Sequence, residues 1–208
     1  GEYVGERNAA GEMEGRGKYV YADGAVYEGE WKADKKEGRG IFRSSSGAVY
    51  EADKAGEKEG RGIFRWANGN VYEGEYKAGK REGRGIFRWA NGNVYEGEYK
   101  ADEREGRGIE RAANGDVYEG EFKAGKREGQ GTYLCADGRI EVGFYKAGTS
   151  VGERESVLWT ADGWTAIQVQ DGKWVKTMSL EEAERRVERL GLPMPVRREG
   201  KWTVGQPV

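Results

Sequence analysis

The stretch that decides the fold is GRGIFRWANGNVYEGEYKAGKREGRGIFRWANGNVYEGEYKA, which runs from Gly60 to Ala101 and contains nearly the same 23 residues twice. Enzymes seldom need two active sites side by side, whereas stacked structural units repeat because each one packs only against its neighbours. Self-similarity at a fixed period is the signature of repeat architectures. The stretch therefore predicts an array built from one repeated unit.

The repeat continues on both sides of this stretch. A Tyr-Glu-Gly-Glu-aromatic element begins at Tyr27, Tyr72, Tyr95 and Tyr118, and the related tyrosines Tyr3 and Tyr50 extend the series. An EGRG or EGQG element occupies residues 14–17, 37–40, 59–62, 82–85, 105–108 and 128–131. The period is 23 residues, with slips of one residue that we place in turns.

One unit, residues 71–90, shows what each copy builds. Residues 71–77 alternate aromatic or glycine with charged side chains, and residues 83–89 alternate in the same way. A period of two is typical of a β-strand. The glycine-containing segment KAGKRE and the segment ANGN are typical of turns. Each unit is therefore predicted to be a β-hairpin.

Successive hairpins predict a mainly β fold: an elongated, twisted, single-layer antiparallel meander with one short helix near the C-terminus. We expect six to seven hairpins over residues 1–148. Residues 149–208 are expected to form a capping hairpin, a helix and a tail.

The two faces of this sheet are expected to differ. One face carries tyrosines, other aromatic residues and glycines, which leave room for rings to lie against the backbone. The other face carries Glu73 and Glu75 on one strand, and we expect Arg84 and Arg88 to lie opposite them on the next. Cross-strand pairs of opposite charge are worth a few tenths of a kcal/mol each, about 0.2 to 1.

Composition narrows the function. The chain has 208 residues, 35% of them charged, 24 aromatic side chains and a net charge of −2, so nucleic acid is not an expected partner. It has no histidine and one cysteine, Cys135, which excludes Ser-His-Asp and Cys-His catalysis and disfavours a structural metal site. None of the Gly-x-Gly pairs completes a dinucleotide or phosphate-binding motif. We expect no enzyme, no catalytic residues, no metal and no cofactor.

The repeated pattern closely resembles the MORN repeat family. The residues that carry the resemblance are YEGEW (27–31), YEGEY (72–76 and 95–99), YEGEF (118–122), the Gly-x-Gly pairs and the ANG or ADG turns, over about residues 3–145. The family often has histidine before Gly-x-Gly, where this chain has glutamate, as at Glu82, so a more acidic rim is expected. Ala52 and Lys54 in the third unit and Glu110 and Ala112 in the fifth are expected to interrupt the aromatic face.

The resemblance implies a scaffold or adaptor, a subunit of a larger assembly of the kind found in the cytoskeleton. Two interpretations of the aromatic face stay open: it is a core only, or it also binds an extended peptide or a helix. Trp66 and Trp89 are the favoured contacts, since tryptophan is enriched at binding hot spots. The partner-binding candidates are Tyr27, Trp31, Phe42, Phe64, Trp66, Tyr72, Tyr76, Phe87, Trp89, Tyr95, Tyr99, Tyr118 and Phe122.

The resemblance also implies an alternative, peripheral attachment to membranes through anionic phospholipid headgroups. The lipid-binding candidates are Lys80, Arg81, Arg84, Arg107, Lys126 and Arg127. Nearby glutamates offset these charges, so the alternative ranks lower. Ribbons pairing as a homo-oligomer would also fit. We expect an intracellular, cytoplasmic location, with cytoskeletal or membrane association, and an organelle stays open because the N-terminus can be processed.

The segment after residue 150 predicts a hairpin and then a helix. Asp171-Gly172 predicts a tight turn that sets Val169 opposite Trp174 and Ile167 opposite Lys176. In the helix, Ser179 is the expected N-cap, with Glu182 completing a capping box. Leu180, Ala183, Val187 and Leu190 form its apolar stripe, and Gly191 and Pro193 end it. We expect this helix to cap the open end of the sheet, and a helix that docks a partner is the alternative.

Overall fold

The computed structural model is mainly β, an antiparallel meander in which the described residues form a single short α-helix near the C-terminus. The residues described are 1–53, 59–150, 156–163, 165–170 and 173–204. The chain forms two compact units. Unit 1 comprises residues 1–91 and 99–102, and unit 2 comprises residues 92–98 and 103–208.

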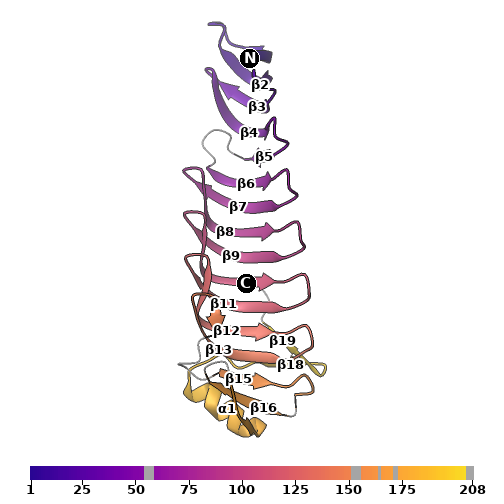
Figure 1. Cartoon of the computed structure of the whole chain (residues 1–208). Helices are drawn as coiled ribbons and strands as arrows, with labels where there is room; N and C mark the ends of the chain where they lie inside the picture. The colour runs from indigo at the N-terminus through magenta and orange to yellow at the C-terminus, as the bar shows by residue number, and fades with distance from the viewer. Residues whose placement is uncertain (54–58, 151–155, 164, 171–172, 205–208) are drawn as a thin grey trace. The chain divides into compact units, whose positions relative to one another are not determined.

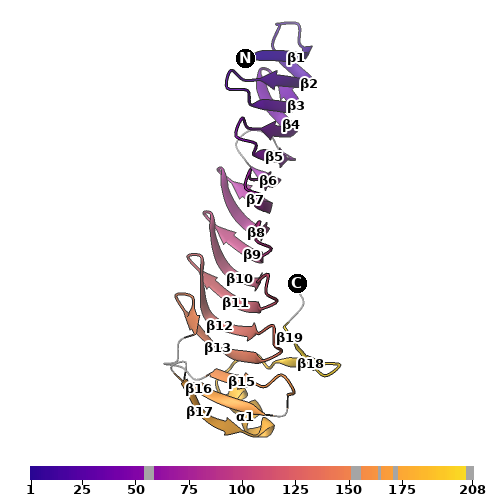
Figure 2. The same cartoon turned by 45° about the vertical axis from the view of Figure 1, so that its right-hand side comes forward.

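Unit 1 holds eight strands, each paired antiparallel with the next in chain order (Figures 1 and 2). Their bounds are β1 (Glu2–Arg7), β2 (Met13–Val20), β3 (Val26–Lys32), β4 (Lys35–Arg43), β5 (Val49–Ala52), β6 (Gly60–Arg65), β7 (Val71–Lys77) and β8 (Lys80–Arg88). Strand β9 (Val94–Lys100) spans the division of the chain between the units.

The hairpin β7–β8 shows how each copy folds. Tyr72 lies opposite Phe87, as the alternation predicts, and Lys77 lies opposite Lys80. The turn therefore contains only Ala78 and Gly79, with φ of 48° and 79°. Two residues with positive φ match the twist of the flanking strands. The longer turn expected over KAGKRE is wrong, because residues 80–82 continue the strand.

A bulge in β8 sets the register of the charged residues. Gly74 pairs with Gly85, but Glu75 pairs with Glu82, so Gly83 and Arg84 are extra residues in β8. Gly83 takes a φ of 61°, which glycine adopts without steric cost. The predicted placement of Arg84 and Arg88 opposite the glutamates is therefore wrong.

Charged side chains meet diagonally instead. Glu73 lies opposite Ile86, and it reaches Arg88, its diagonal neighbour, at 3.8 Å. Both side chains are about half exposed, so this pair contributes little to stability.

The glutamate of each EGRG element joins neighbouring repeats. Its carboxylate accepts a hydrogen bond of 2.8–3.0 Å from a turn N–H one repeat further on. The acceptor and donor pairs are Glu14 and Ala33, Glu59 and Ala78, Glu82 and Ala101, Glu105 and Ala124, and Glu128 and Ala147. Each of these alanines has a positive φ. The glutamates expected to form an acidic rim therefore hold the hairpins together.

Unit 2 continues the antiparallel pattern and ends in the helix. Its strands are β10 (Glu103–Arg111), β11 (Val117–Lys123), β12 (Lys126–Leu134), β13 (Ile140–Lys146), β14 (Thr149–Ser150), β15 (Ser156–Trp159), β16 (Ala166–Gln170), β17 (Lys173–Met178), β18 (Val196–Arg198) and β19 (Lys201–Thr203), with α1 (Leu180–Arg189) after β17. Strands β18 and β19 form a separate hairpin. None of the helical residues described forms a span long and apolar enough to cross a membrane.

The register of the last hairpin differs from expectation by one residue. Val169 lies opposite Trp174, as predicted, but Lys176 pairs with Gln168 and Ile167 with Thr177. A bulge at Val175 causes the shift, so the predicted pairing of Ile167 with Lys176 is wrong. The predicted turn at Asp171-Gly172 lies outside the described residues.

Helix α1 begins and ends as its sequence predicts. The Ser179 side chain accepts a hydrogen bond from the Glu182 backbone N–H, and the Glu182 carboxylate pairs with Lys176. Gly191, with a φ of 65°, ends the helix. Ala183 and Val187 are fully buried against Val142, Val157, Trp159 and other apolar residues of the last strands. The helix therefore covers one face of β13–β17, and Trp174 on β17 remains 67% exposed.

Candidate interaction surfaces

The aromatic face is built on pairs of glycines. The Tyr72 ring lies flat on Gly74 and Gly85, so that a Cβ at Gly85 would come within 2.5 Å of ring atom Cε2. Its hydroxyl donates a 3.0 Å hydrogen bond to the Glu75 carbonyl oxygen. The same arrangement recurs at Tyr27, Tyr95 and Tyr118. Glycines in these strands therefore allow the close approach of a ring, as the sequence predicted.

Most of the predicted partner-binding residues form this core. The buried ones are Tyr27, Trp31, Tyr72, Tyr76, Phe87, Tyr95, Tyr99, Tyr118 and Phe122. Burial raises the pKa of Tyr27 to about 12, since the phenolate would lose its hydration. Phe42, Phe64, Trp66 and Trp89 are half-buried. These four are the candidates on the aromatic face that a partner can reach.

The half-buried rings of unit 1 form a continuous ladder. Ring centroids are 4.5 Å apart for Phe64 and Trp66, 5.3 Å for Trp66 and Phe87, and 4.6 Å for Phe87 and Trp89. These distances are in the range of favourable aromatic pairs. The ladder brings Trp66 and Trp89, from two neighbouring copies of the repeat, onto one surface.

A basic residue after each turn stacks on the aromatic core. The Arg81 guanidinium lies 5.7 Å from the Tyr72 ring centroid, 5.4 Å from Phe87 and 5.1 Å from Tyr99, and it pairs with Asp102 at 3.2 Å. Lys36, Arg104 and Arg127 take equivalent positions. The sequence signal is a basic residue directly before the EGRG glutamate, which period-two analysis assigns only to a turn.

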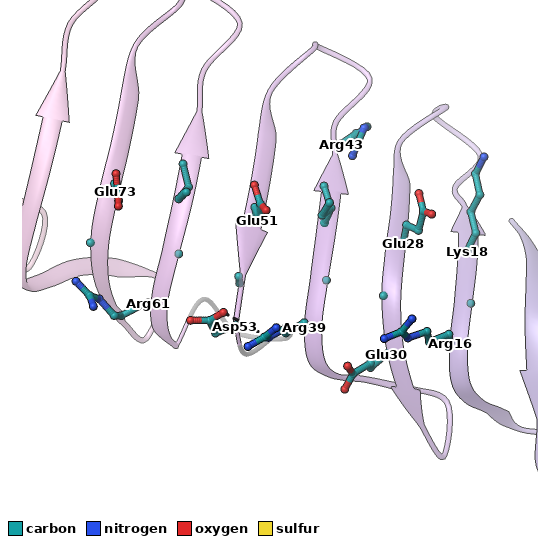
Figure 3. A pocket seen from close by; sticks show the side chains of 18 of the residues that line it. Arg16, Lys18, Glu28, Glu30, Arg39, Arg43, Glu51, Asp53, Arg61 and Glu73 are labelled. Atoms are coloured by element: carbon teal, nitrogen blue, oxygen red, sulfur yellow. Dashed lines mark ion pairs between the residues drawn. The ribbon is translucent and has the colours of Figure 1, made fainter.

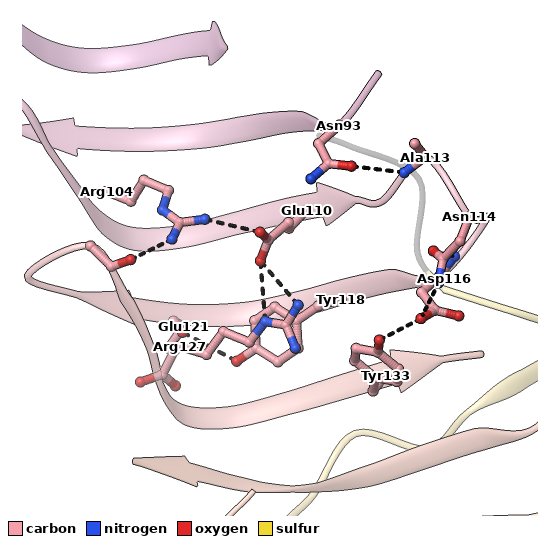
Figure 4. Close-up of polar contacts among 11 residues, drawn as sticks. Asn93, Arg104, Glu110, Ala113, Asn114, Asp116, Tyr118, Glu121, Arg127 and Tyr133 are labelled. Carbon is pink, nitrogen blue, oxygen red and sulfur yellow. Dashed lines mark hydrogen bonds and ion pairs between the residues drawn. The ribbon is translucent and has the colours of Figure 1, made fainter. Parts of the chain in front are cut away.

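The fifth repeat places a carboxylate on the aromatic face, as predicted. Glu110 lies opposite Tyr118 and bridges Arg104 at 3.3 Å and Arg127 at 3.1 Å (Figure 4). All three side chains are 21–25% exposed. The stacked arginines therefore receive a partner where the other units have a phenylalanine. Of the other expected interruption, Ala52 is buried between Gly40 and Gly62, and Lys54 lies outside the described residues.

The turns of unit 2 hold a second polar group. Asp116 accepts hydrogen bonds from the Tyr133 hydroxyl at 2.7 Å and the Ala136 backbone N–H at 2.7 Å (Figure 4). The Tyr133 hydrogen bond, followed by that of Ala136, lowers the pKa of Asp116. Burial raises the pKa of the nearby Cys135 thiol, which disfavours a reactive thiolate. These contacts connect adjacent turns, as Asn70 does with Ala90 at 2.9 Å.

The opposite face of unit 1, which we call the charged face, is hollowed. A groove of about 940 Å³ extends over β1 to β7 and is lined by charged side chains with two isoleucines, Ile41 and Ile63 (Figure 3). Within the described residues no group of three carboxylate, thiol or imidazole side chains could hold a metal ion. The groove therefore has the chemistry of a protein-binding surface.

The six lipid-binding candidates do not share one surface. Arg81 and Arg127 are stacked on the aromatic face, whereas Arg84 and Arg107 occupy the exposed bulge positions of β8 and β10. Lys80 and Lys126 follow the hairpin turns. Attachment to anionic lipid requires several basic groups on one surface, so the alternative stays a prediction.

Chains of near-identical hairpins whose tyrosines pack on glycine pairs form one class, the open β-repeat proteins. A sequence profile of the MORN repeat matches residues 9–26, 27–49, 54–71, 72–94, 95–117 and 118–138. The chain therefore belongs to the MORN-repeat family. No curated protein sequence matches it.

Two solved structures from Drosophila melanogaster are similar to the chain. One is the TCP10c domain of Sas-4, with 12% identity and a TM-score of 0.47 over 83% of this chain and 100% of that one. The other is the SAS-4 TCP domain in complex with a proline-rich motif of Ana2, with 12% identity and a TM-score of 0.40 over 77% of this chain and 88% of that one. Likeness at this level indicates nothing about the ligand of this chain.

Proposed function

We propose that the chain is a non-enzymatic scaffold that binds a partner protein along the aromatic face and acts as a subunit of a larger assembly. MORN repeats are interaction modules, and six of them make up most of this chain. The partner is an extended peptide or a helix, because both present side chains in a row.

The ladder from Phe64 to Trp89 carries this proposal. Two half-buried tryptophans lie within 5.3 Å of the same phenylalanine, so their rings are held in place before a partner arrives. Rings that are already ordered lose little conformational entropy on binding. Large aromatic side chains that remain partly exposed are also the ones in which binding energy concentrates.

Photo-cross-linking and then affinity measurement test the proposal. A photoreactive phenylalanine analogue at position 66 identifies the partner in cells, and purified partner is titrated with Trp66→Ala and Trp89→Ala variants. We expect each variant to weaken binding by at least about tenfold, as hot-spot truncations do. Far-UV circular dichroism is expected to stay unchanged.

Trp174→Ala is the matched control, because Trp174 is exposed and lies on β17, away from the ladder. It is expected to bind the partner as the wild type does. Unchanged affinity of both Trp66→Ala and Trp89→Ala would exclude the aromatic face as the binding surface.

A further inference from the structure

The groove on the charged face of unit 1 is lined by two parallel rows of opposite charge. Glu28, Glu51 and Glu73 follow one line across β3, β5 and β7, with Ile41 and Ile63 between them on β4 and β6. A second line, two residues further along the strands, holds the arginines Arg16, Arg39 and Arg61 (Figure 3). The groove therefore presents an acidic edge, a basic edge and apolar side chains between the acids.

The basic edge arises because the neighbouring glutamates are already used. The Glu75 carboxylate turns toward the bulge and accepts the Arg84 backbone N–H at 3.3 Å, and Glu6 accepts the Arg16 N–H at 3.2 Å. The bulge thus removes the carboxylates of this row from the groove and leaves the arginines exposed.

These charges are largely without partners inside the chain. Among the described residues, ion pairs within 4.0 Å on this face join Arg39 to Asp53 and Glu73 to Arg88, each at 3.8 Å and well exposed. No ion pair between described residues involves Glu28, Glu51 or the other two arginines, Arg16 and Arg61. A partner that brings both signs of charge would find both edges available.

In unit 2 the equivalent face carries a helix. Val142 lies opposite Thr132, Thr132 opposite Glu119 and Glu119 opposite Ile109, so these residues continue the Glu-Ile line of their own unit. Helix α1 packs there, burying Ala183 and Val187 against Val142 and its neighbours. This face of the repeat sheet therefore accepts a helix when apolar residues line it.

The dimensions of the groove also suit a helix. Seven strands about 4.8 Å apart span about 29 Å, the length of a helix of about 19 residues. Ile41 and Ile63, two strands apart, are separated by about 10 Å, close to the roughly 10.5 Å between helix residues seven apart. A second copy of the chain would present the same hollowed face and could not fill this one.

We infer that the charged face of unit 1 is a second docking surface, and that it takes an amphipathic helix of a partner protein. The helix places apolar residues on Ile41 and Ile63, basic residues along the glutamate edge and acidic residues along the arginine edge. This surface lies on the opposite side of the sheet from the tryptophan ladder, so it is independent of the aromatic-face proposal.

Three synthetic peptides of 21 residues test the inference by fluorescence anisotropy. Each forms a helix with the same apolar stripe, and the two flanks carry lysine on one side and glutamate on the other, lysine on both sides, or glutamate on both sides. Exchanging the two flanks is no control, because a helix laid in the reverse direction restores the match. The mixed peptide is expected to bind about tenfold more tightly than either peptide of one sign, since several exposed pairs each contribute a small amount.

Reversing the acidic edge is expected to change this preference. In a Glu28→Lys, Glu51→Lys, Glu73→Lys variant both edges are basic, so the peptide with two glutamate flanks becomes the tightest ligand. A matched variant places the same three lysines at exposed glutamates outside the groove, Glu184, Glu188 and Glu199. It is expected to keep the wild-type order of affinities.

The outcomes separate the two proposals. Equal affinity for all three peptides, or equal affinity for a scrambled peptide without the apolar stripe, would overturn the helix site. A dimer that forms in wild type but not in the acidic-edge variant, measured by light scattering, would assign the groove to a second copy and also overturn it. Peptide binding that persists in the Trp66→Ala and Trp89→Ala variants is expected, so failure of one surface leaves the other standing.

Discussion

Replacing Gly85 with alanine tests the contact on which every repeat depends. A Cβ at this position would lie 2.5 Å from Tyr72 Cε2 and 2.6 Å from Cζ, well inside van der Waals contact. The ring cannot move aside, because Tyr72 is fully buried and packs edge-on against Tyr76 and Tyr99, with centroids 5.2 Å away in both cases. The added methyl group must therefore displace the core of neighbouring repeats.

The third repeat supplies an internal comparison of the same substitution. A Cβ at Gly62 would lie 2.9 Å from the nearest atoms of Tyr50, so less movement relieves the contact. Overpacking of a core costs about 1–3 kcal/mol, and replacing glycine by alanine recovers about 0.4–1 kcal/mol by restricting the unfolded chain. We expect a net loss of about 2 kcal/mol for Gly85→Ala and less than about 1 kcal/mol for Gly62→Ala.

Urea unfolding followed by far-UV circular dichroism and tryptophan fluorescence measures both variants. Repeat arrays need not unfold in one step, so hydrogen exchange at the amides of β7 and β8 is measured alongside. Protection in these strands is expected to fall in Gly85→Ala and to change little in Gly62→Ala. The ring-on-glycine argument is refuted by an equal or smaller loss for Gly85→Ala than for Gly62→Ala.

Other predictions follow from the remaining contacts. Glu105→Ala removes the acceptor of the Ala124 N–H and should lower the free energy of unfolding by about 1 kcal/mol, with Glu105→Gln losing less; no change in urea midpoint would exclude the glutamate link. Ala101→Gly should raise stability by a few tenths of a kcal/mol in the same assay, because Ala101 has a φ of 49°. Burial raises the pKa of Tyr27 from 10.0 to about 12, so stability present below pH 10 should fall as the pH rises toward 12; a flat unfolding profile over this range would contradict it. Liposomes containing anionic lipid should not pellet the chain in a salt-sensitive way, and pelleting abolished by Arg107→Glu would revive the lipid alternative.

The hairpins and their faces could be predicted because alternation of side chains is a local property. Tyr72 opposite Phe87 follows from counting residues out from a turn, and the rings on glycine follow from the missing Cβ. The bulge could not be predicted in this way. It depends on Gly83 with a φ of 61° and on the Glu75 carboxylate meeting the Arg84 N–H, and neither changes the alternation pattern.

The tail shows the same limit. Ser179 and Gly191 mark the ends of α1 by residue type alone, and both ends are confirmed. The extra residue Val175 lies in an otherwise regular strand, and it shifts the pairing of Lys176 without any local signal. Registers across a bulge depend on contacts between strands, which a single sequence does not display.

The candidate surfaces were only partly predictable, because burial depends on neighbouring repeats. Tyr72 and Trp66 both have aromatic side chains on one face, yet one is fully buried and the other half-buried. The difference comes from position along the strand: Tyr72 lies over the glycine pair, whereas Trp66 follows the last residue of β6. Hydrophobicity alone does not separate the two.

The copied stretch from Gly60 to Ala101 indicates where binding specificity can lie. Its tyrosines, glycines and EGRG glutamates all contact a neighbouring strand or repeat, so a change at any of them disturbs the array. Even the departure at Asp102, in the turn after the copy, is tied to the repeat before it by a hydrogen bond from the Arg81 N–H. The tryptophans at the strand ends and the exposed charges opposite them have no such requirement. A partner of this chain can therefore be selected at these positions without any cost to the stacking of the hairpins.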